Sequence, residues 1–203
     1  MKDFPLFPCN NGIASLILCE IPTRREAYVL VRSVFGSLEG LLQECAAFCR
    51  GAGAEKVYAG GEQEFSHYPV YAHLVERSLD RKLLPGTRAV AKRTEDPRWA
   101  EQYNERFHRV HGAKTYRTTP PDALYVYDGE TLIGLGQIID GELAAVAAIE
   151  KGRGADCVAA LAEYIPGEKI RLLCAEENLP ATRLYDRLGF SRDRVKRIWY
   201  ELP

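Results

Sequence analysis

The chain has 203 residues, of which 46% are hydrophobic and 27% are charged. This composition is that of an ordinary globular protein and excludes a disordered or collagen-like chain. Its length predicts one large domain, or one domain with a smaller companion. The formal net charge of −1 provides no general attraction to nucleic acid or to an acidic lipid surface, so neither is expected as a partner.

The sequence is expected to lack a membrane-spanning or secretory segment. Its most apolar early run is residues 13–18, which is far shorter than the roughly 20 residues needed to cross a bilayer. The N-terminal residues show no apolar stretch of the kind found in signal peptides. The six cysteines form no Cys-x-x-Cys pair and several lie in apolar runs, which favours reduced, buried thiols in a cytoplasmic protein.

The first 84 residues predict a subdomain of the order strand, strand, helix, strand. Its expected elements are a hairpin of residues 12–21 and 26–33, a helix of residues 38–49 and a strand of residues 55–59. One more helix is predicted at residues 71–79. Leu84-Pro85-Gly86 marks a boundary, so the predicted domains are residues 1–84 and residues 85–203.

The second part alternates strands and helices. Strands are expected at residues 87–93, 123–127, 131–139, 143–149, 169–175 and 190–200, and helices at residues 98–110, 156–164 and 179–188. Asp128-Gly129 favours a tight turn between antiparallel strands. Residues 27–60 and 143–175 share a strand-helix-strand plan, which indicates either a decayed duplication or a coincidence between common units.

A glycine-rich turn, Lys151-Gly152-Arg153-Gly154, leads from a strand into a helix. A helix N-terminus presents unpaired N–H groups and a partial positive charge, and glycine allows a phosphate to approach the backbone. Lys151 and Arg153 add two cations. The turn therefore fits a phosphate-binding loop, but it equally fits an ordinary strand-to-helix connection with surface cations.

The same turn resembles the dinucleotide-binding pattern G-x-G-x-x-G/A, with Cys157 in the last place and Glu176 about 20 residues further on. That fold needs several parallel strands in succession. The hairpins that precede the turn predict antiparallel strands, and few residues follow Ala175. A dinucleotide-binding protein is therefore the weaker alternative.

A more specific pattern occupies residues 175–190. Asn178 is followed by Ala181, then by Leu184-Tyr185, and then by Gly189-Phe190. This segment resembles the last motif of the GNAT superfamily of N-acetyltransferases, and the order of elements over residues 87–203 is similar to that of the superfamily. The resemblance implies an α+β (α/β) fold with a mixed, mostly antiparallel central sheet flanked by helices, here preceded by the β-β-α-β subdomain.

The resemblance also implies acetyl-CoA as cosubstrate, an amine acceptor and no metal. In the superfamily two central strands part, and the pantetheine arm lies along the strand before the glycine-rich turn. Backbone amides of that strand would hold the oxyanion, and the turn with the helix start would hold the pyrophosphate. The matching residues are Val146, Ala147 and Ala148 on the strand, and Lys151, Gly152, Arg153, Gly154, Ala155 and Asp156 in the turn. Asp156 departs from the superfamily pattern, because a carboxylate there opposes a pyrophosphate unless its side chain turns away.

By the same resemblance Tyr185 protonates the departing thiolate, and Asn178 and Ala181 face the cofactor. From the residues alone, Asn178 is equally a helix N-cap and Tyr185 equally a core tyrosine. A base must take the proton of the attacking amine. Glu142 is the preferred candidate for that role, ahead of Glu150 and Glu176.

Aromatic side chains in the second part are candidates for an acceptor cleft, although packing is the alternative for each: Trp99, Tyr103, His111, Tyr116, Tyr125 and Tyr127. His108 and His111 share a helix face but lack a third ligand, so no metal site is predicted. A homodimer is left open. Two hypotheses remain: an acetyl-CoA-dependent N-acetyltransferase acting on a small molecule or peptide, or a non-catalytic relative whose Asp156 marks an altered cofactor site.

Overall fold

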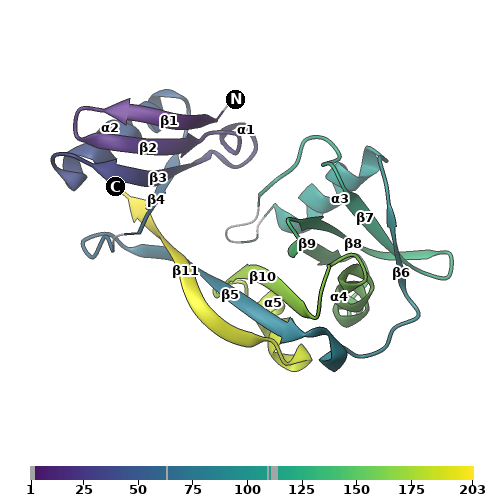
Figure 1. The fold of residues 1–203 in the computed structure, drawn as a ribbon. Helices are drawn as coiled ribbons and strands as arrows, with labels where there is room; N and C mark the ends of the chain where they lie inside the picture. The colour runs from purple at the N-terminus through teal and green to yellow at the C-terminus, as the bar shows by residue number, and fades with distance from the viewer. Residues whose placement is uncertain (1–2, 63, 109, 111–113) are drawn as a thin grey trace. The chain divides into compact units, whose positions relative to one another are not determined.

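The structure, a computed structural model, describes residues 3–62, 64–108, 110 and 114–203 (Figure 1). The chain forms two compact units, Met1–Leu74 with Val195–Pro203, and Val75–Arg194. These units divide the chain elsewhere than at residues 84–85, and the assignment of residues 1–84 and 85–203 as domains stays a prediction. Within the described residues no helix combines the length and apolarity needed to span a bilayer.

The first unit has the predicted order strand, strand, helix, strand, with a further strand before it. Its elements are β1 (Phe4–Cys9), β2 (Gly12–Ile17), the short helix α1 (Ile21–Arg24), β3 (Glu26–Val34), α2 (Leu38–Gly51), β4 (Lys56–Gly60), the start of β5 (Val70–Asp80) and the end of β11 (Ser191–Leu202). The strand order is β1-β2-β3-β4-β11. The sequence does not predict β1, because Pro5 and Pro8 disfavour a strand. The strand forms nevertheless because β1 lies at the edge of the sheet, where proline is tolerated.

The second unit carries the remaining elements. They are the 3₁₀ turn η1 (Arg81–Leu83), β6 (Val90–Arg93), α3 (Arg98–Phe107), β7 (Ala123–Asp128), β8 (Thr131–Ile139), β9 (Glu142–Ala148), α4 (Gly154–Ala162), β10 (Lys169–Ala175) and α5 (Leu179–Leu188). The strand order is β11-β5-β10-β9-β8-β7-β6. The pairs β6–β7, β7–β8 and β8–β9 are antiparallel and β9–β10 is parallel. The prediction of a mixed, mostly antiparallel sheet flanked by helices is confirmed.

The helix predicted at residues 71–79 is wrong, because this segment is strand β5. Ala72, Leu74 and Glu76 are good helix formers, which made the segment look helical. In the structure β5 is hydrogen-bonded between β11 and β10. Pairing on both sides and burial outweigh helix preferences of under about 1 kcal/mol per residue.

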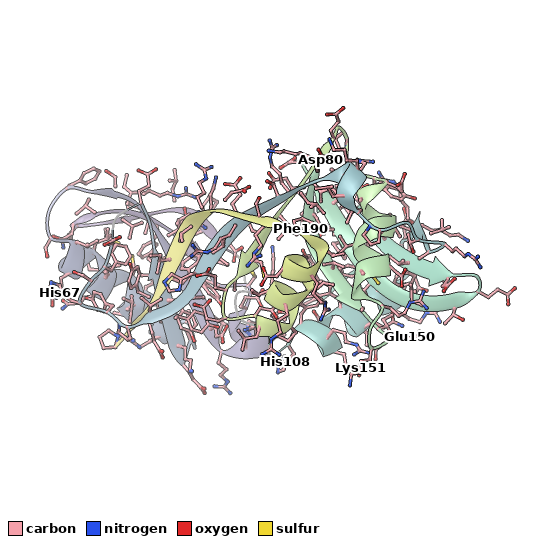
Figure 2. All side chains as sticks on the ribbon, turned by 90° about the horizontal axis from the view of Figure 1, so that it is seen from below. His67, Asp80, His108, Glu150, Lys151 and Phe190 are labelled. Carbon is pink, nitrogen blue, oxygen red and sulfur yellow. The ribbon has the colours of Figure 1, made fainter. Side chains whose placement is uncertain are left out.

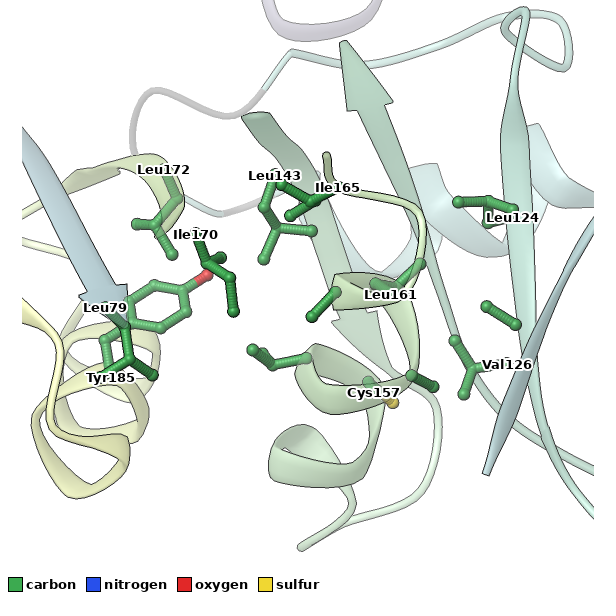
Figure 3. Close-up of a cluster of buried hydrophobic side chains, with 14 of the residues drawn as sticks. Leu79, Leu124, Val126, Leu143, Cys157, Leu161, Ile165, Ile170, Leu172 and Tyr185 are labelled. Carbon is green, nitrogen blue, oxygen red and sulfur yellow. The ribbon is translucent and has the colours of Figure 1, made fainter. Parts of the chain in front are cut away.

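The second unit packs a separate buried cluster on each face of its sheet. Successive residues of β7 point to opposite faces, so Leu124 and Val126 join one cluster while Ala123 and Tyr125 join the other. The first cluster includes α4 and Tyr185 of α5 (Figure 3), and the second includes Trp99 and other residues of α3. Helices therefore cover both faces of the sheet.

Glycines on β8 let α4 lie directly on the sheet. A Cβ atom at Gly134 would lie 2.2 Å from Cys157 Sγ, and one at Gly136 would lie 2.3 Å from Leu161 Cδ1. Cys157 and Leu161 are wholly buried on the inner face of α4. The helix that starts at the glycine-rich turn is thus held in place through close packing against β8.

Candidate functional site

The parallel strands β9 and β10 part soon after they meet. Their ladder holds one residue pair, Leu143 opposite Leu172. Beyond it, β9 continues to Ala148 and β10 to Ala175, and no further pair joins them among the described residues. On its other side β9 stays paired with β8 as far as Ala148. The carboxyl half of β9 thus has an open backbone edge on the side of β10, and this edge includes the predicted residues Val146, Ala147 and Ala148.

A β-bulge at Ala144 marks the point where the two strands part. Ala145 lies opposite Gln137 and Leu143 opposite Ile138, so Ala144 is the extra residue. A bulge bends its strand and increases the local twist. It also reverses the side-chain alternation: Leu143 lies in the cluster of α4 and α5, whereas Ala145 and Ala147 lie in that of α3. The bend accounts for the loss of pairing with β10.

The glycine-rich turn brings β9 to the start of α4. Figure 2 labels Glu150 and Lys151 in this turn. Gly152 has a φ of 89°, a left-handed conformation that favours glycine. Arg153 is the N-cap and makes no side-chain cap bond. Among the described residues, no acceptor contacts the backbone N–H groups of Gly152, Gly154, Ala155 and Asp156. These groups are free to bind an anion.

The corresponding helix of the first unit starts differently. There the backbone N–H groups of Phe35 and Gly36 donate to the carbonyl oxygen of Asn11, and that of Ser37 donates to Asn11 Oδ1. The Ser37 hydroxyl accepts from the N–H of Gly40. The parallel strands β3 and β4 also stay paired over five residue pairs. The first unit repeats the strand-helix-strand plan, but its parallel strands stay paired and the Ser37 hydroxyl occupies one N–H group of its helix start.

Asp156 turns away from the free N–H groups. One carboxylate oxygen accepts from the Thr87 hydroxyl at 2.8 Å and the other accepts from Arg153 Nε at 2.8 Å. The hydrogen bond from Thr87, together with Arg153, lowers the pKa of Asp156. Arg153 also donates to Asp128 at 2.6 Å, so two carboxylates share its charge. Neither Thr87 nor Asp128 was anticipated from the sequence, where no motif links them to the turn.

Gly154 serves helix packing. A Cβ atom there would lie 2.8 Å from Leu184 Cδ2, so glycine allows the start of α4 to approach α5. Ala155 and Asp156 occupy the first turn of α4. Lys151 is exposed and forms no ion pair within the described part of the chain. It is therefore the cation of the turn that remains available to a ligand.

Tyr185 is 6% exposed and lies on α5 in the same buried cluster as Leu143 and Leu172, the pair at which the ladder ends. Its ring packs against Phe190 at 5.3 Å. In Figure 3 the hydroxyl end of Tyr185 points from α5 toward Ile170 of β10. Burial, with a smaller contribution from Cys174, raises the pKa of Tyr185. Its hydroxyl group therefore remains protonated at neutral pH.

Asn178 caps α5. Its side-chain oxygen accepts from the N–H of Ala181 at 3.4 Å, as expected for an N-cap residue. The structure thus brings Asn178 and Ala181 together at the start of α5, directly after β10. A role of either residue in holding a cofactor stays a prediction.

The candidate bases lie at different places. Glu142 is half-buried at the start of β9, next to Leu143 and before the bulge. Glu150 lies in the turn after β9, and Glu176 is paired with Arg192 at 2.5 Å. Glu142 is therefore nearest in the strand to the point where β9 and β10 part, and its role as a base stays a prediction.

The predicted acceptor aromatics form the cluster under α3. Trp99 stacks on Tyr103 at 4.8 Å, and the Tyr116 ring meets both edge-on. Trp99, Tyr103 and Tyr125 are at most 5% exposed, which indicates that they serve packing. His111 lies outside the described residues. No group of three potential metal ligands occurs in the ranges that the structure describes.

Neither protein-family models nor curated proteins match the chain, but solved structures do. A functionally unknown conserved protein from Staphylococcus epidermidis matches with a TM-score of 0.61 and 8% identity, over 96% of this chain and 91% of its own. A GCN5-related N-acetyltransferase from Sphaerobacter thermophilus matches with a TM-score of 0.56 and 16% identity, over 94% of this chain and 76% of its own. A GCN5-related N-acetyltransferase from Kribbella flavida matches with a TM-score of 0.52 and 14% identity, over 99% of this chain and 87% of its own.

These similarities show that the chain has the GNAT fold, as the motif of residues 178–190 predicts. At such low identity they establish the fold alone. The fold also excludes the dinucleotide-binding alternative, because the strand before the glycine-rich turn has β8 as an antiparallel neighbour.

Proposed function

We propose that the protein is an acetyl-CoA-dependent N-acetyltransferase that acts on a primary amine of a small molecule or peptide. One observation carries the proposal: β9 and β10 part after a single residue pair, and the gap between them lies beside a helix whose N–H groups are free. Similar structures include proteins named as N-acetyltransferases.

Acetyl-CoA fits this site in three respects. The open edge of β9 offers N–H and C=O groups to the amides of the pantetheine arm. The N–H groups of Gly152, Gly154, Ala155 and Asp156 suit the diphosphate, with Lys151 as a nearby cation. The carboxylate of Asp156 is engaged by Thr87 and Arg153, which lessens the main objection that the sequence raised.

The reaction proceeds by direct attack. The free amine attacks the thioester carbonyl, a C–N bond forms, and a backbone N–H of residues 146–148 stabilises the oxyanion. The C–S bond then breaks and Tyr185 donates its proton to the thiolate. The proton lost by the amine passes to a base, for which Glu142 acting through water is our candidate; Glu142 then releases this proton to solvent, and solvent returns one to the Tyr185 phenolate. Acetyl-CoA and the amine become CoA and the acetamide.

A titration with acetyl-CoA tests the proposal directly. Ligand that binds only the folded protein raises its stability as RT ln(1 + [L]/Kd), so the Tm should rise saturably. An amine screen that detects released thiol then tests turnover. If millimolar acetyl-CoA leaves the Tm unchanged, the proposal fails in favour of a non-catalytic relative. The neutralisation of Arg153 by Asp128 and Asp156 is the observation that favours this second candidate.

Replacing Asp156 with alanine should strengthen acetyl-CoA binding. The change removes a negative charge beside the diphosphate and releases one side of Arg153, for an expected gain of about three- to fivefold in affinity. Calorimetric titration of acetyl-CoA measures it. Glu163→Ala is the matched control, because it removes an exposed carboxylate just beyond the other end of α4 and should leave affinity unchanged. Weaker binding by a folded Asp156→Ala variant would show that Asp156 supports the site.

A further inference from the structure

A pocket within the first compact unit gathers basic side chains. Its volume is about 380 Å³ and it is lined by residues 30–34 of β3, by Gly61 and Glu62 after β4, and by Lys196 and Arg197 of β11. The last pair of the β3–β4 ladder is Leu30 opposite Gly60, and β3 continues beyond it to Val34. The pocket therefore lies at the carboxyl ends of a parallel strand pair.

Glycines shape this end of the sheet. A Cβ atom at Gly60 would lie 2.9 Å from the carbonyl oxygen of Ile198, and one at Gly61 would lie 3.3 Å from Val31 Cβ. Larger residues would push β11 or β3 outward. Because the glycines contribute no side chains, the chemistry of the pocket comes from its charged residues.

The charges of the pocket are unbalanced. It is lined by the three cations Arg32, Lys196 and Arg197, and by one carboxylate, Glu62. Within the described residues, none of the three cations forms an ion pair with a carboxylate. Arg32 Nε donates instead to the Ser15 hydroxyl at 2.8 Å, and the Arg197 guanidinium lies 5.4 Å from the centre of the Trp199 ring. The pocket thus holds more positive charge than its one carboxylate balances.

Burial and the charge of Arg32 both disfavour the charge of Arg197. Arg197 is half-buried, and its burial, followed by the nearby charge of Arg32, lowers its pKa. An anion between the arginines would relieve both effects. Guanidinium groups present paired N–H donors that match the oxygens of a phosphate group, and a lysine adds a further point charge.

We propose that this pocket binds a small phosphate-bearing anion of the phosphate monoester class, held between Arg32 and Arg197, with Lys196 as a further cation of the lining. The excess of cations over Glu62 matches the charge of a dianion. The volume lies at the lower end of the range for small-molecule sites. The inference does not depend on the proposed acetyl transfer, because none of these residues belongs to the β9–β10 site.

A titration with inorganic phosphate, in which NMR monitors the backbone amide signals, tests the inference. At constant ionic strength the amide signals of Gly61, Lys196 and Arg197 should shift saturably with phosphate and not with chloride. Arg32→Gln removes one exposed cation beside Arg197 and should weaken phosphate binding about tenfold, or ~1.4 kcal/mol, and Lys196→Gln should weaken it by a smaller factor. Glu62→Gln should strengthen it.

Lys56→Gln is the matched control. It removes an exposed cation from the start of β4, outside the pocket, and should leave the affinity for phosphate within about twofold of the parent value. If Lys56→Gln and Arg32→Gln weakened phosphate binding equally, the net charge of the protein and not the pocket would explain the effect, and the proposal would be overturned. Shifts no larger than those with chloride would overturn it too, as would binding of succinate as tight as that of phosphate.

Discussion

Replacing Tyr185 with phenylalanine is expected to lower kcat for acetyl transfer by about 100-fold, since a positioned general acid contributes on the order of 10² to 10⁴. The ring of Tyr185 is packed against Phe190 and within the cluster that holds Leu143 and Leu172. Phenylalanine fills the same space, so the fold and the affinity for acetyl-CoA should be retained. Steady-state kinetics with an amine from the screen, together with an acetyl-CoA titration, measure both.

Tyr164→Phe is the control for this change. The hydroxyl of Tyr164 donates to the carbonyl oxygen of Ala91 in the same unit, and its loss should leave kcat unchanged. Burial raises the pKa of Tyr185 above its ordinary value near 10, so this group should cause no decline in kcat below pH 10. If a folded Tyr185→Phe variant turns over as fast as the parent protein, the role of proton donor is wrong.

Gly136→Ala should lower the free energy of unfolding of the second unit by about 2–3 kcal/mol, the upper part of the range for overpacked cores. The added Cβ atom would lie 2.3 Å from Leu161 Cδ1 and 2.7 Å from the carbonyl oxygen of Ala145. The leucine can change rotamer, but the carbonyl belongs to the backbone of β9. Relief therefore requires β8, β9 or α4 to move.

Urea denaturation followed by hydrogen exchange at the α4 amides measures this loss in the second unit. Gly51→Ala is the control, because nothing lies within 4 Å of its added Cβ atom. Alanine at the end of α2 should be neutral or stabilising by up to about 1 kcal/mol. A Gly136→Ala variant within about 0.5 kcal/mol of the parent would show that α4 does not depend on this close packing.

The sequence predicted the elements of the second unit well because local signals there agree with the fold. Residues 169–175 and 179–188 were placed at the observed bounds of β10 and α5, where a period-two strand precedes an Asn cap and a helix closed by Gly189. Strand β5 was mistaken for a helix because its neighbours, and not its own residues, decide its conformation.

The details of the candidate site were harder to predict. Ala144 and Ala145 are both alanines, so the sequence does not show which of them is the extra residue of the bulge. Pairing with β8 decides its position. The orientation of Asp156 depends on Thr87, which lies 69 residues earlier in the chain. Such contacts arise from tertiary packing, and no local pattern encodes them. The motif around Asn178 and Tyr185 was visible because it lies on one continuous segment.

The bulge at Ala144 implies that the presence of one residue decides how the second half of β9 is oriented in the sheet. Deleting one residue there would restore regular alternation to the rest of β9 and turn its last side chains to the opposite face. The deletion should also remove the bend at the point where β9 leaves β10. In this fold, a backbone edge that can receive a ligand arises from one inserted residue and needs no special side chain.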